Sequence, residues 1–439
     1  MDRQPNQLRI VVIGAGFGGL QTAQSLSKSG AEVLLIDRHN YHTFVPLLYQ
    51  VAAAQVPPET VAYPVRTLLR RTRNLRFLQA EVTRVNFAQR QVETREAVIA
   101  YDYLVLATGS QPQHLGIPGV SEHGFMLKTL AQAVALRNHL LHCFEQAERE
   151  TDPQIRQRLL TVVIVGGGPT GVELAGTLVE LKQALRRDYP GLDLGTLQIV
   201  LVQSGDRLLP NLPARLGRYT TRKLRRLGVN VHLETRVSRV TSTTVTFAQG
   251  PTLGTETVIW AAGLEAALPA VATPPPTGAK QKLKVRATLQ LLHEPQVYAI
   301  GDVAQGEEPL TGVAPEALQQ GVAVARNLRR QLRGQAPKSF HYFNKGRLAI
   351  IGGWAGVGKI GPLLLTGWLP WLLWLGVHLV YLPGWRNRLV LLLSWLQSYG
   401  LGDRPLRLIL SSPPLTPPPP SQRLPAIAAD RASLDPPAE

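Results

Sequence analysis

Short apolar runs that end beside a glycine recur along the chain and predict its architecture. The run LRIVVI (residues 8–13) stops at Gly14, and the run LLTVVIV (residues 159–165) stops at Gly166. Each is followed by apolar residues at helical spacing, so each predicts a strand, a tight turn and a helix. Two further apolar runs end at or near a glycine: 103–107 is followed by Thr108-Gly109, and 297–300 by Gly301. Strands that alternate with helices in this way predict an α/β fold with parallel sheets.

The first turn carries glycines at the spacing of a dinucleotide-binding loop. Gly14, Gly16 and Gly19 stand between the predicted strand and helix. Glycines there let the chain turn tightly, let the backbone approach a pyrophosphate and let helix and strand pack closely, while the helix N-terminus offers amide donors. The next predicted strand, AEVLLID, ends at Asp37, close to the spacing of a ribose-binding carboxylate. Together these features predict a bound dinucleotide.

The same construction recurs about 150 residues later. The three glycine positions are taken by Gly166, Gly168 and Gly171. Two Rossmann-like units in one chain predict two bound dinucleotides. One would be a tightly held cofactor and the other an exchangeable one, as in an electron-transfer enzyme. The alternative is a second unit that no longer binds a dinucleotide.

The strand that follows the second glycine loop ends at Gln203, and Arg207 lies four residues further on. Unless Gln203 is only a polar strand end, a neutral amide binds ribose without repelling a 2′-phosphate, so we expect NADPH to be accepted beside NADH.

Composition narrows the chemistry further. The single cysteine, Cys143, excludes a CxxC redox pair and a disulfide framework, and its helix-like surroundings indicate a core residue. No metal site is expected, because neither His42 nor His378 has a second ligand at helical spacing. The N-terminus has no signal-peptide pattern. A net charge of +17 requires a basic surface, for which nucleic acid and an anionic membrane are the usual partners.

The C-terminal region favours the membrane over nucleic acid. No charged residue occurs between Leu363 and Leu382, and arginines follow from Arg386 onward. Tryptophan beside arginine at an apolar boundary is typical of a membrane interface. We expect helices that lie in one leaflet; a spanning helix and a buried dimer interface are the alternatives. After residue 410 the chain is Pro-rich and too poor in large apolar residues to fold. Six of the seven tryptophans lie in the C-terminal region before residue 410, at Trp354, Trp368, Trp371, Trp374, Trp385 and Trp395.

Short motifs in series identify a resemblance. The third apolar run is followed by Thr108-Gly109 and the fourth by Gly301-Asp302. Together with the two glycine loops, in this order, these motifs make the chain resemble the flavoproteins with two dinucleotide-binding domains. Within that family the chain resembles type II NAD(P)H:quinone oxidoreductases over nearly its whole length, roughly residues 8 to 410. The segments that carry this narrower likeness are residues 40–52, 256–263, 311–321, 343–352 and 371–395.

The resemblance implies FAD at the first loop, with contacts from Thr108 and Gly109 and a hydrogen bond from Asp302 to the ribityl chain. It implies that Glu173 lies near nicotinamide and flavin, where a carboxylate could relay protons, although glutamate also suits a helix N-terminus. It implies that Gln319 lies near the quinone; the alternative is a solvent-facing polar residue. At Pro315-Glu316 the chain carries different residues from many relatives, so its local contacts with the quinone are expected to differ.

The expected function is transfer of two electrons from NADH or NADPH through FAD to a lipid-soluble quinone, without proton pumping. The expected location is the cytoplasmic face of the membrane. A homodimer is possible. Two alternatives are reduction of a demethylated naphthoquinone in quinone biosynthesis and a membrane-bound NAD(P)H redox sensor. The expected domains are FAD-binding (1–115 and 285–340), NAD(P)-binding (116–284) and membrane-anchoring (341–410), followed by a disordered tail (411–439).

Overall fold

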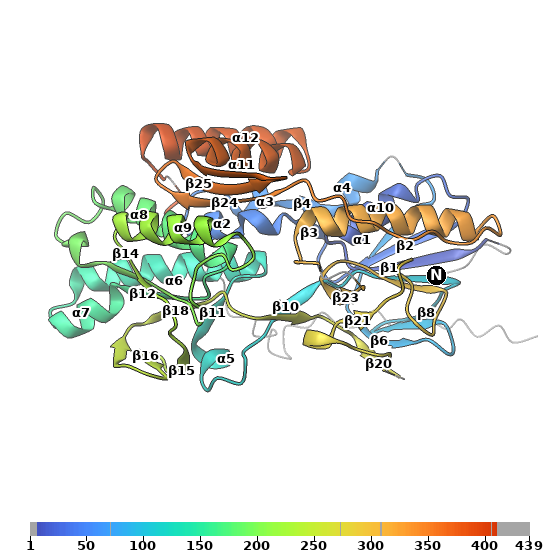
Figure 1. Ribbon diagram of the computed structural model, residues 1–439, viewed down its shortest axis with the longest axis horizontal. Helices are drawn as coiled ribbons and strands as arrows, with labels where there is room; N and C mark the ends of the chain where they lie inside the picture. The colour runs from blue at the N-terminus through green and yellow to red at the C-terminus, as the bar shows by residue number, and fades with distance from the viewer. Residues whose placement is uncertain (1–6, 71, 273, 308–309, 405, 411–439) are drawn as a thin grey trace, which may run out of the picture.

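Two parallel sheets lie side by side in the computed structural model, which describes residues 7–70, 72–272, 274–307, 310–404 and 406–410 (Figure 1). The early strands build the right-hand half in Figure 1, and the middle of the chain builds the left-hand half. The α/β class predicted from the apolar runs is confirmed. The predicted Pro-rich tail, residues 411–439, falls outside the described residues.

The first sheet has four strands that are buried along most of their length and an edge strand, β5, that is partly exposed. All its neighbouring strands run parallel, in the order β22-β9-β1-β2-β5. The strands are β1 (Arg9–Ile13), β2 (Glu32–Asp37), β5 (Leu75–Gln79), β9 (Tyr103–Leu106) and β22 (Val297–Ala299). Helix α1 (Phe17–Ser25) follows β1 and packs against α10 (Ala314–Gln331) from much later in the chain. Parallel order brings the ends of β1, β9 and β22 to one edge of this sheet.

The second sheet repeats this plan in the order β11-β18-β12-β13-β14. Its strands are β11 (Gly124–Met126), β12 (Thr161–Val165), β13 (Gln198–Val202), β14 (Val229–His232) and β18 (Thr257–Trp260). A capping box, in which Thr129 and Gln132 bond each other's backbone, starts the long helix α6. The helices of this half are α5 (Val120–His123), α6 (Leu130–Arg149), α7 (Pro153–Leu159), α8 (Pro169–Leu185) and α9 (Ala214–Arg226).

Small sheets join the two halves and mark where the chain crosses between them. β10 (Ser110–Pro112) leaves the first half and pairs antiparallel with the returning β19 (Leu264–Ala266). β20 (Ala270–Val271) pairs parallel with β6 of the first half. The other small strands are β3 (Tyr41–Thr43), β4 (Ala62–Pro64), β6 (Val82–Asn86), β7 (Gln91–Thr94), β8 (Val98–Ala100), β15 (Val237–Val240), β16 (Thr244–Phe247), β17 (Thr252–Gly254), β21 (Leu283–Lys284) and β23 (Ala304–Gln305).

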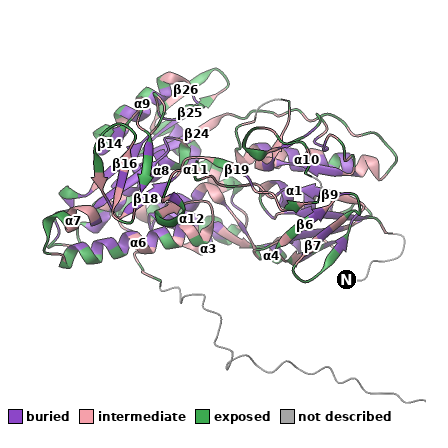
Figure 2. Ribbon diagram, turned by 90° about the horizontal axis from the view of Figure 1, so that it is seen from below, coloured by how far each residue is buried: buried purple, intermediate pink, exposed green. Residues whose placement is uncertain are grey.

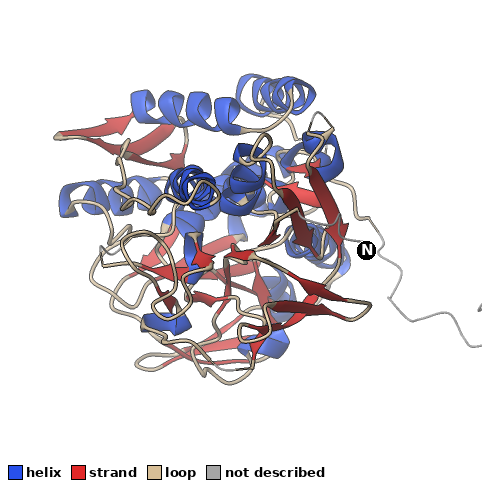
Figure 3. Cartoon of the chain, turned by 90° about the vertical axis from the view of Figure 1, so that its right-hand side faces the viewer, coloured by secondary structure: helices blue, strands red, loops and turns tan. Residues whose placement is uncertain are grey.

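The C-terminal region is a three-stranded sheet and two helices, which form the topmost layer in Figure 1 and in Figure 3. The uncharged stretch 363–382 is not one helix, because Gly367, at φ +88°, separates strand β26 from helix α11. Among the described residues, none of the helices combines the length and apolar character needed to cross a bilayer. The elements are β24 (Arg347–Gly352), β25 (Ala355–Ile360), β26 (Leu363–Gly367), α11 (Trp368–Tyr381), α12 (Trp385–Trp395) and a π-helical turn (Leu396–Leu401).

This C-terminal layer shares its core with the second sheet. The buried side chains of Trp371, Trp374 and Trp395 belong to one apolar cluster with residues of α6 and α8. The same cluster takes in residues 44–61, which include α2 (Leu48–Ala52) and α3 (Pro58–Val61), while α4 (Val65–Leu69) packs near the first sheet. Figure 2 shows buried ribbon in the interior of both halves. The C-terminal helices therefore complete the body of the protein and are not a detachable appendage.

Candidate active site

The first glycine loop leaves an open place at the N-terminus of α1. Gly14 has φ +102°, and a Cβ there would stand 2.4 Å from the Ala107 carbonyl oxygen. A Cβ on Gly19 would stand 1.9 Å from the Gly14 carbonyl oxygen. A Cβ on Gly16, the N-cap residue, would meet nothing within 4 Å. The outer glycines are thus required by the fold, whereas the middle one leaves room for phosphates beside free helix amides.

The second loop is built in the same way. Gly166 has φ +118°, a Cβ on Gly171 would stand 2.0 Å from the Gly166 carbonyl oxygen, and the space at Gly168 is open. Even the hydrogen bonds correspond: Gly14 N–H donates to Ile36 O at 2.8 Å, and Gly166 N–H donates to Val202 O at 2.8 Å. Two places that suit a dinucleotide pyrophosphate are therefore present, in loops of the same design.

The residue that ends the next strand differs between the two loops. Asp37 Oδ2 accepts a hydrogen bond from Ala15 N–H at 2.7 Å, and Gln203 Oε1 accepts one from Gly167 N–H at 2.8 Å. The two side chains hold equivalent positions, one charged and one neutral. Arg207 lies close by in sequence, and its buried Nε has no hydrogen-bond partner among the described residues. The second site thus combines a neutral amide with a nearby cation.

The two turns at the edge of the first sheet meet through their side chains. Ser110 Oγ donates to Asp302 Oδ2 at 2.5 Å, and Lys128 Nζ lies 2.8 Å from that hydroxyl and 3.4 Å from the same carboxylate oxygen. The Thr108 hydroxyl is buried without a partner among the described residues, and Gly109 has φ +73°. Sequence reasoning missed Lys128, because it lies in the short connection between β11 and α6 and no local motif includes it.

Glu173 lies beneath the C-terminal layer. Its Oε1 accepts hydrogen bonds from Trp374 Nε1 at 3.1 Å and from Ile350 N–H at 3.4 Å, whereas Oε2 accepts none from the described residues. Burial raises the pKa of Glu173 to about 8, against the opposing effect of these two donors. Burial therefore favours the protonated carboxyl, in which Oε1 is held by two donors and Oε2 has no partner among the described residues.

Trp374, which fixes that oxygen, is itself held by His378. The two rings stack with centroids 3.6 Å apart, and His378 Nδ1 lies 2.7 Å from the Trp374 carbonyl oxygen. Burial lowers the pKa of His378 to about 4, so the imidazole is neutral at physiological pH. Sequence reasoning did not connect Trp374 with Glu173, because the two are brought together only by the packing of α11 and α8 against β24.

The two adjacent glutamines of α10 have different partners. Gln320 is buried, and its Oε1 accepts a hydrogen bond from Gly301 N–H at 2.6 Å, so it holds the turn that carries Asp302. Gln319 instead bonds the backbone of Phe343 twice, through Nε2 to its carbonyl at 2.9 Å and through Oε1 from its N–H at 3.0 Å. The Gln319 amide therefore ties α10 to the segment that leads into β24.

Comparison with known proteins gives the family. A model of the pyridine nucleotide-disulphide oxidoreductase family matches residues 8–321. The chain is 34% identical over 407 residues to the type II NADH:quinone oxidoreductase Ndh of Mycobacterium tuberculosis, a match that covers 89% of this chain and 88% of that protein. The chain is a type II NADH:quinone oxidoreductase family member. The resemblance read from the motifs is thus confirmed.

Other members and neighbours of the type II family agree. The type II NADH:quinone oxidoreductase of Staphylococcus aureus is 29% identical over 374 residues, covering 82% of this chain and 91% of that protein. The structure of NDH2 from Plasmodium falciparum in complex with NADH has a TM-score of 0.86 at 20% identity, and covers 92% of this chain and 100% of that one. The sulfide:quinone oxidoreductase of Aquifex aeolicus has a TM-score of 0.70 at 18% identity over 87% of this chain and 92% of that one. These structural likenesses show the fold alone.

The cysteine of this family member has no part in the site. Cys143 is buried on α6, and burial raises the pKa of its thiol to about 11. A thiol that stays protonated and covered is a poor nucleophile, in accord with the expected core role. Among the described residues, no group of three or more His, Cys, Asp or Glu could hold a metal ion.

The outer surface of the C-terminal layer is apolar. Large hydrophobic side chains of α11 and α12 are exposed while their tryptophans at 371, 374 and 395 are buried. The exposed set on the two helices comprises Trp368, Leu369, Leu372, Leu373, Val377, Val380, Tyr381, Trp385, Leu389, Leu392 and Leu393.

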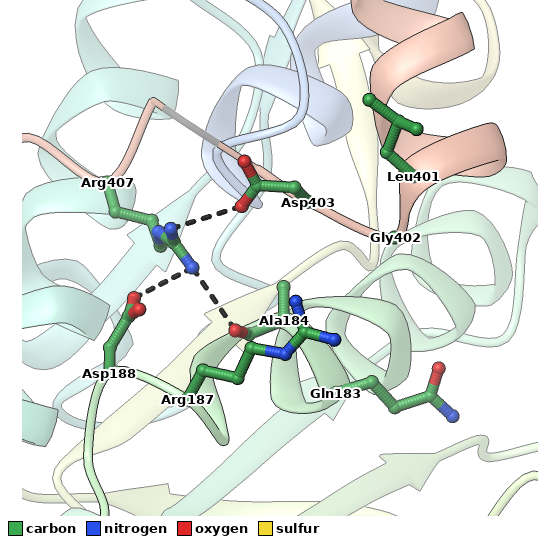
Figure 4. Close-up of a pocket in the computed structure, with 8 residues that line it drawn as sticks. All are labelled: Gln183, Ala184, Arg187, Asp188, Leu401, Gly402, Asp403 and Arg407. Carbon is green, nitrogen blue, oxygen red and sulfur yellow. Dashed lines mark hydrogen bonds and ion pairs between the residues drawn. The ribbon is translucent and has the colours of Figure 1, made fainter.

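Arg407 attaches the chain beyond these helices to α8. Its guanidinium lies 2.7 Å from Asp188 and 3.2 Å from Asp403, and donates to the Ala184 carbonyl at 3.1 Å, beside a small cavity of about 180 Å³ (Figure 4).

Proposed function

We infer that this chain transfers two electrons from NADH, through bound FAD, to a membrane quinone. The observation that carries this inference is the pair of glycine loops of identical design, each open at its middle glycine, in a chain of the type II NADH:quinone oxidoreductase family. Bound FAD would supply the capacity to accept a hydride and to pass electrons on. The residues of the chain bind, orient and move protons.

We propose that Gly14, Gly16 and Gly19 receive the FAD pyrophosphate and that Asp37 receives its ribose. The unpartnered Thr108 hydroxyl, the Gly109 turn and the Asp302 carboxylate would contact the rest of the cofactor, because all three lie at the ends of strands β9 and β22. In this proposal the FAD domain comprises residues 1–115 and 285–340. Lys128 and Ser110 hold the Asp302 carboxylate in position.

The second loop would take the nicotinamide dinucleotide within the domain of residues 116–284. Gly166, Gly168 and Gly171 would receive its pyrophosphate, and Gln203 its adenosine ribose. Because Gln203 is neutral and Arg207 is near, we propose that NADPH is accepted as well as NADH.

Glu173 and Gln319 have separate proposed roles in quinone reduction. Glu173 would deliver a proton, since its Oε2 is unbonded and burial holds the pKa of the carboxyl at about 8. Gln319 would act beside the quinone. Its amide is committed to the Phe343 backbone, so we propose that it positions this segment.

We propose that residues 341–410 attach the protein to one leaflet on the cytoplasmic face of an anionic membrane. The support is the exposed apolar surface of α11 and α12 and the net charge of +17. The same surface could bring two copies together, so a homodimer on the membrane belongs to this proposal.

The test is steady-state oxidation of NADH and NADPH by purified, flavin-loaded protein with a panel of acceptors. We expect rapid turnover with respiratory quinones. Turnover restricted to demethylated naphthoquinone would assign the protein to quinone biosynthesis instead. Very slow turnover with every quinone, combined with a partner that binds only after reduction, would indicate a redox sensor and would overturn the proposal.

A further inference from the structure

A basic groove of about 920 Å³ lies between α10 and the segment that returns from it, residues 335–345. No aspartate or glutamate lines it. Its cationic lining is contributed by both walls: three arginines on α10 and a fourth in the turn directly after it, and two lysines on the returning segment. These residues are Arg326, Arg329, Arg330, Arg333, Lys338 and Lys345.

These cations have no acidic partners within the described residues. None of the six takes part in an ion pair there, although Arg330 Nε bonds the Ala336 carbonyl and Lys345 Nζ bonds the Tyr381 hydroxyl. Spacings of three and four residues place Arg329 and Arg330 on the same side of α10 as Arg326. Like charges gathered in this way repel one another, so an anion in the groove would be held by several of them at once.

The groove is preformed, because two side-chain amides fix the distance between its walls. Asn327 on α10 bonds both backbone groups of Lys338, at 2.9 Å to its carbonyl and 2.9 Å from its N–H. Gln319 does the same for Phe343. Rigid walls reduce the entropy that a ligand would otherwise lose in ordering them.

One end of the groove meets the exposed apolar surface. Tyr381, the last residue of α11, lines the groove, and its neighbour Val380 is 67% exposed. Phe343 and Trp385 are 70% and 77% exposed. A ligand that fits this arrangement carries a phosphate at one end and hydrocarbon at the other.

We propose that this groove binds the phosphate headgroup of an anionic phospholipid whose acyl chains lie against α11. The proposal rests on the proposed attachment to a membrane and makes it specific: the groove would retain one lipid, in addition to general attraction between a basic surface and a bilayer. Its position beside Gln319 places the lipid next to the segment that leads into β24.

The groove variant is Arg326→Gln, Arg333→Gln and Lys338→Gln. All three side chains are exposed, and none makes a hydrogen bond to another described residue through its charged group, so folding should be unaffected. The matched control removes three exposed arginines from the face opposite α11 and α12 in Figure 1, near β6 and β15: Arg84→Gln, Arg236→Gln and Arg239→Gln. Both variants lower the net charge equally.

Native mass spectrometry after incubation with phosphatidylglycerol measures retained lipid, and flotation with phosphatidylcholine vesicles, with and without phosphatidylglycerol, measures attachment. We expect one phosphatidylglycerol per chain in the parent and the control and none in the groove variant, whose affinity for the anionic vesicles should fall roughly a hundredfold. Three results would overturn the proposal: equal lipid retention by the groove variant and the parent, no lipid retention by the parent, or equal losses in the groove variant and the control.

NADH oxidation with a water-soluble quinone is measured in parallel. Its failure would count against the proposed function, whereas lost lipid binding with intact oxidation bears on the groove alone.

Discussion

Replacing Trp374 with phenylalanine should move the pH dependence of quinone reduction to higher pH. The change removes the indole N–H that lies 3.1 Å from Glu173 Oε1 but keeps an aromatic ring against His378. A buried hydrogen bond to a charged group contributes about 1.5–3 kcal/mol, and one pH unit corresponds to about 1.4 kcal/mol, so the pKa of Glu173 should rise by about one to two pH units. The donor favours the ionised carboxylate, and its loss therefore favours the protonated form.

The assay is the pH profile of turnover with a long-tailed quinone, between pH 6 and pH 10, on flavin-loaded protein. If protonated Glu173 delivers a proton, parent activity declines above its pKa of about 8, and Trp374→Phe retains activity to higher pH. Trp395→Phe is the control, because Trp395 Nε1 donates to Gln50 at 2.9 Å. An unshifted decline in Trp374→Phe would refute the hydrogen-bond argument. The same decline in Glu173→Gln would show that another group titrates.

Three further predictions follow from the site. Asp37→Ala should weaken FAD binding at least about tenfold, because it removes charge-assisted hydrogen bonds, and flavin release on dilution measures this. Gln203→Glu should lower kcat/KM for NADPH relative to NADH by about tenfold or more through charge repulsion; an unchanged ratio would mean that Gln203 does not face the ribose. Glu173→Gln should leave stability unchanged at pH 4 and increase it by a few kcal/mol at pH 9. The sign follows because burial raises the pKa of Glu173 from 4.5 to about 8, so the parent loses stability as pH rises between those values; urea unfolding at both pH values measures it.

The dinucleotide loops could be predicted from the sequence because their constraints are local. Gly14 and Gly166 need positive φ, and Gly19 and Gly171 need the absence of a Cβ, so each motif records its own geometry. Strand ends are equally local, which is why Asp37 and Gln203 could be assigned to equivalent positions. The uncharged stretch 363–382 was harder, because apolar composition does not distinguish strand β26 from helix α11; a glycine with positive φ divides them.

The rest of the site depends on contacts between residues far apart in the chain. Trp374 meets Glu173 across 201 positions, and Lys128 meets Asp302 across 174. No periodicity or motif encodes such pairs. The core above α8 is another such case, because Trp371, Trp374 and Trp395 of the C-terminal layer fill it and their loss would expose it.

The bonds between the C-terminal layer and residues 50–60 have a consequence for how the protein is made. Trp395 bonds Gln50, Asn387 bonds the carbonyl of Thr60, and Arg404 bonds the carbonyl of Ala53. During synthesis the N-terminal segment emerges first, yet its partners leave the ribosome more than 300 residues later, after both sheets have been translated. We expect α2 and α3 to remain unfinished until then. The exposed apolar surface of α11 and α12, for which we propose membrane attachment, forms equally late, so a nascent chain would be complete as an enzyme only when that surface is present.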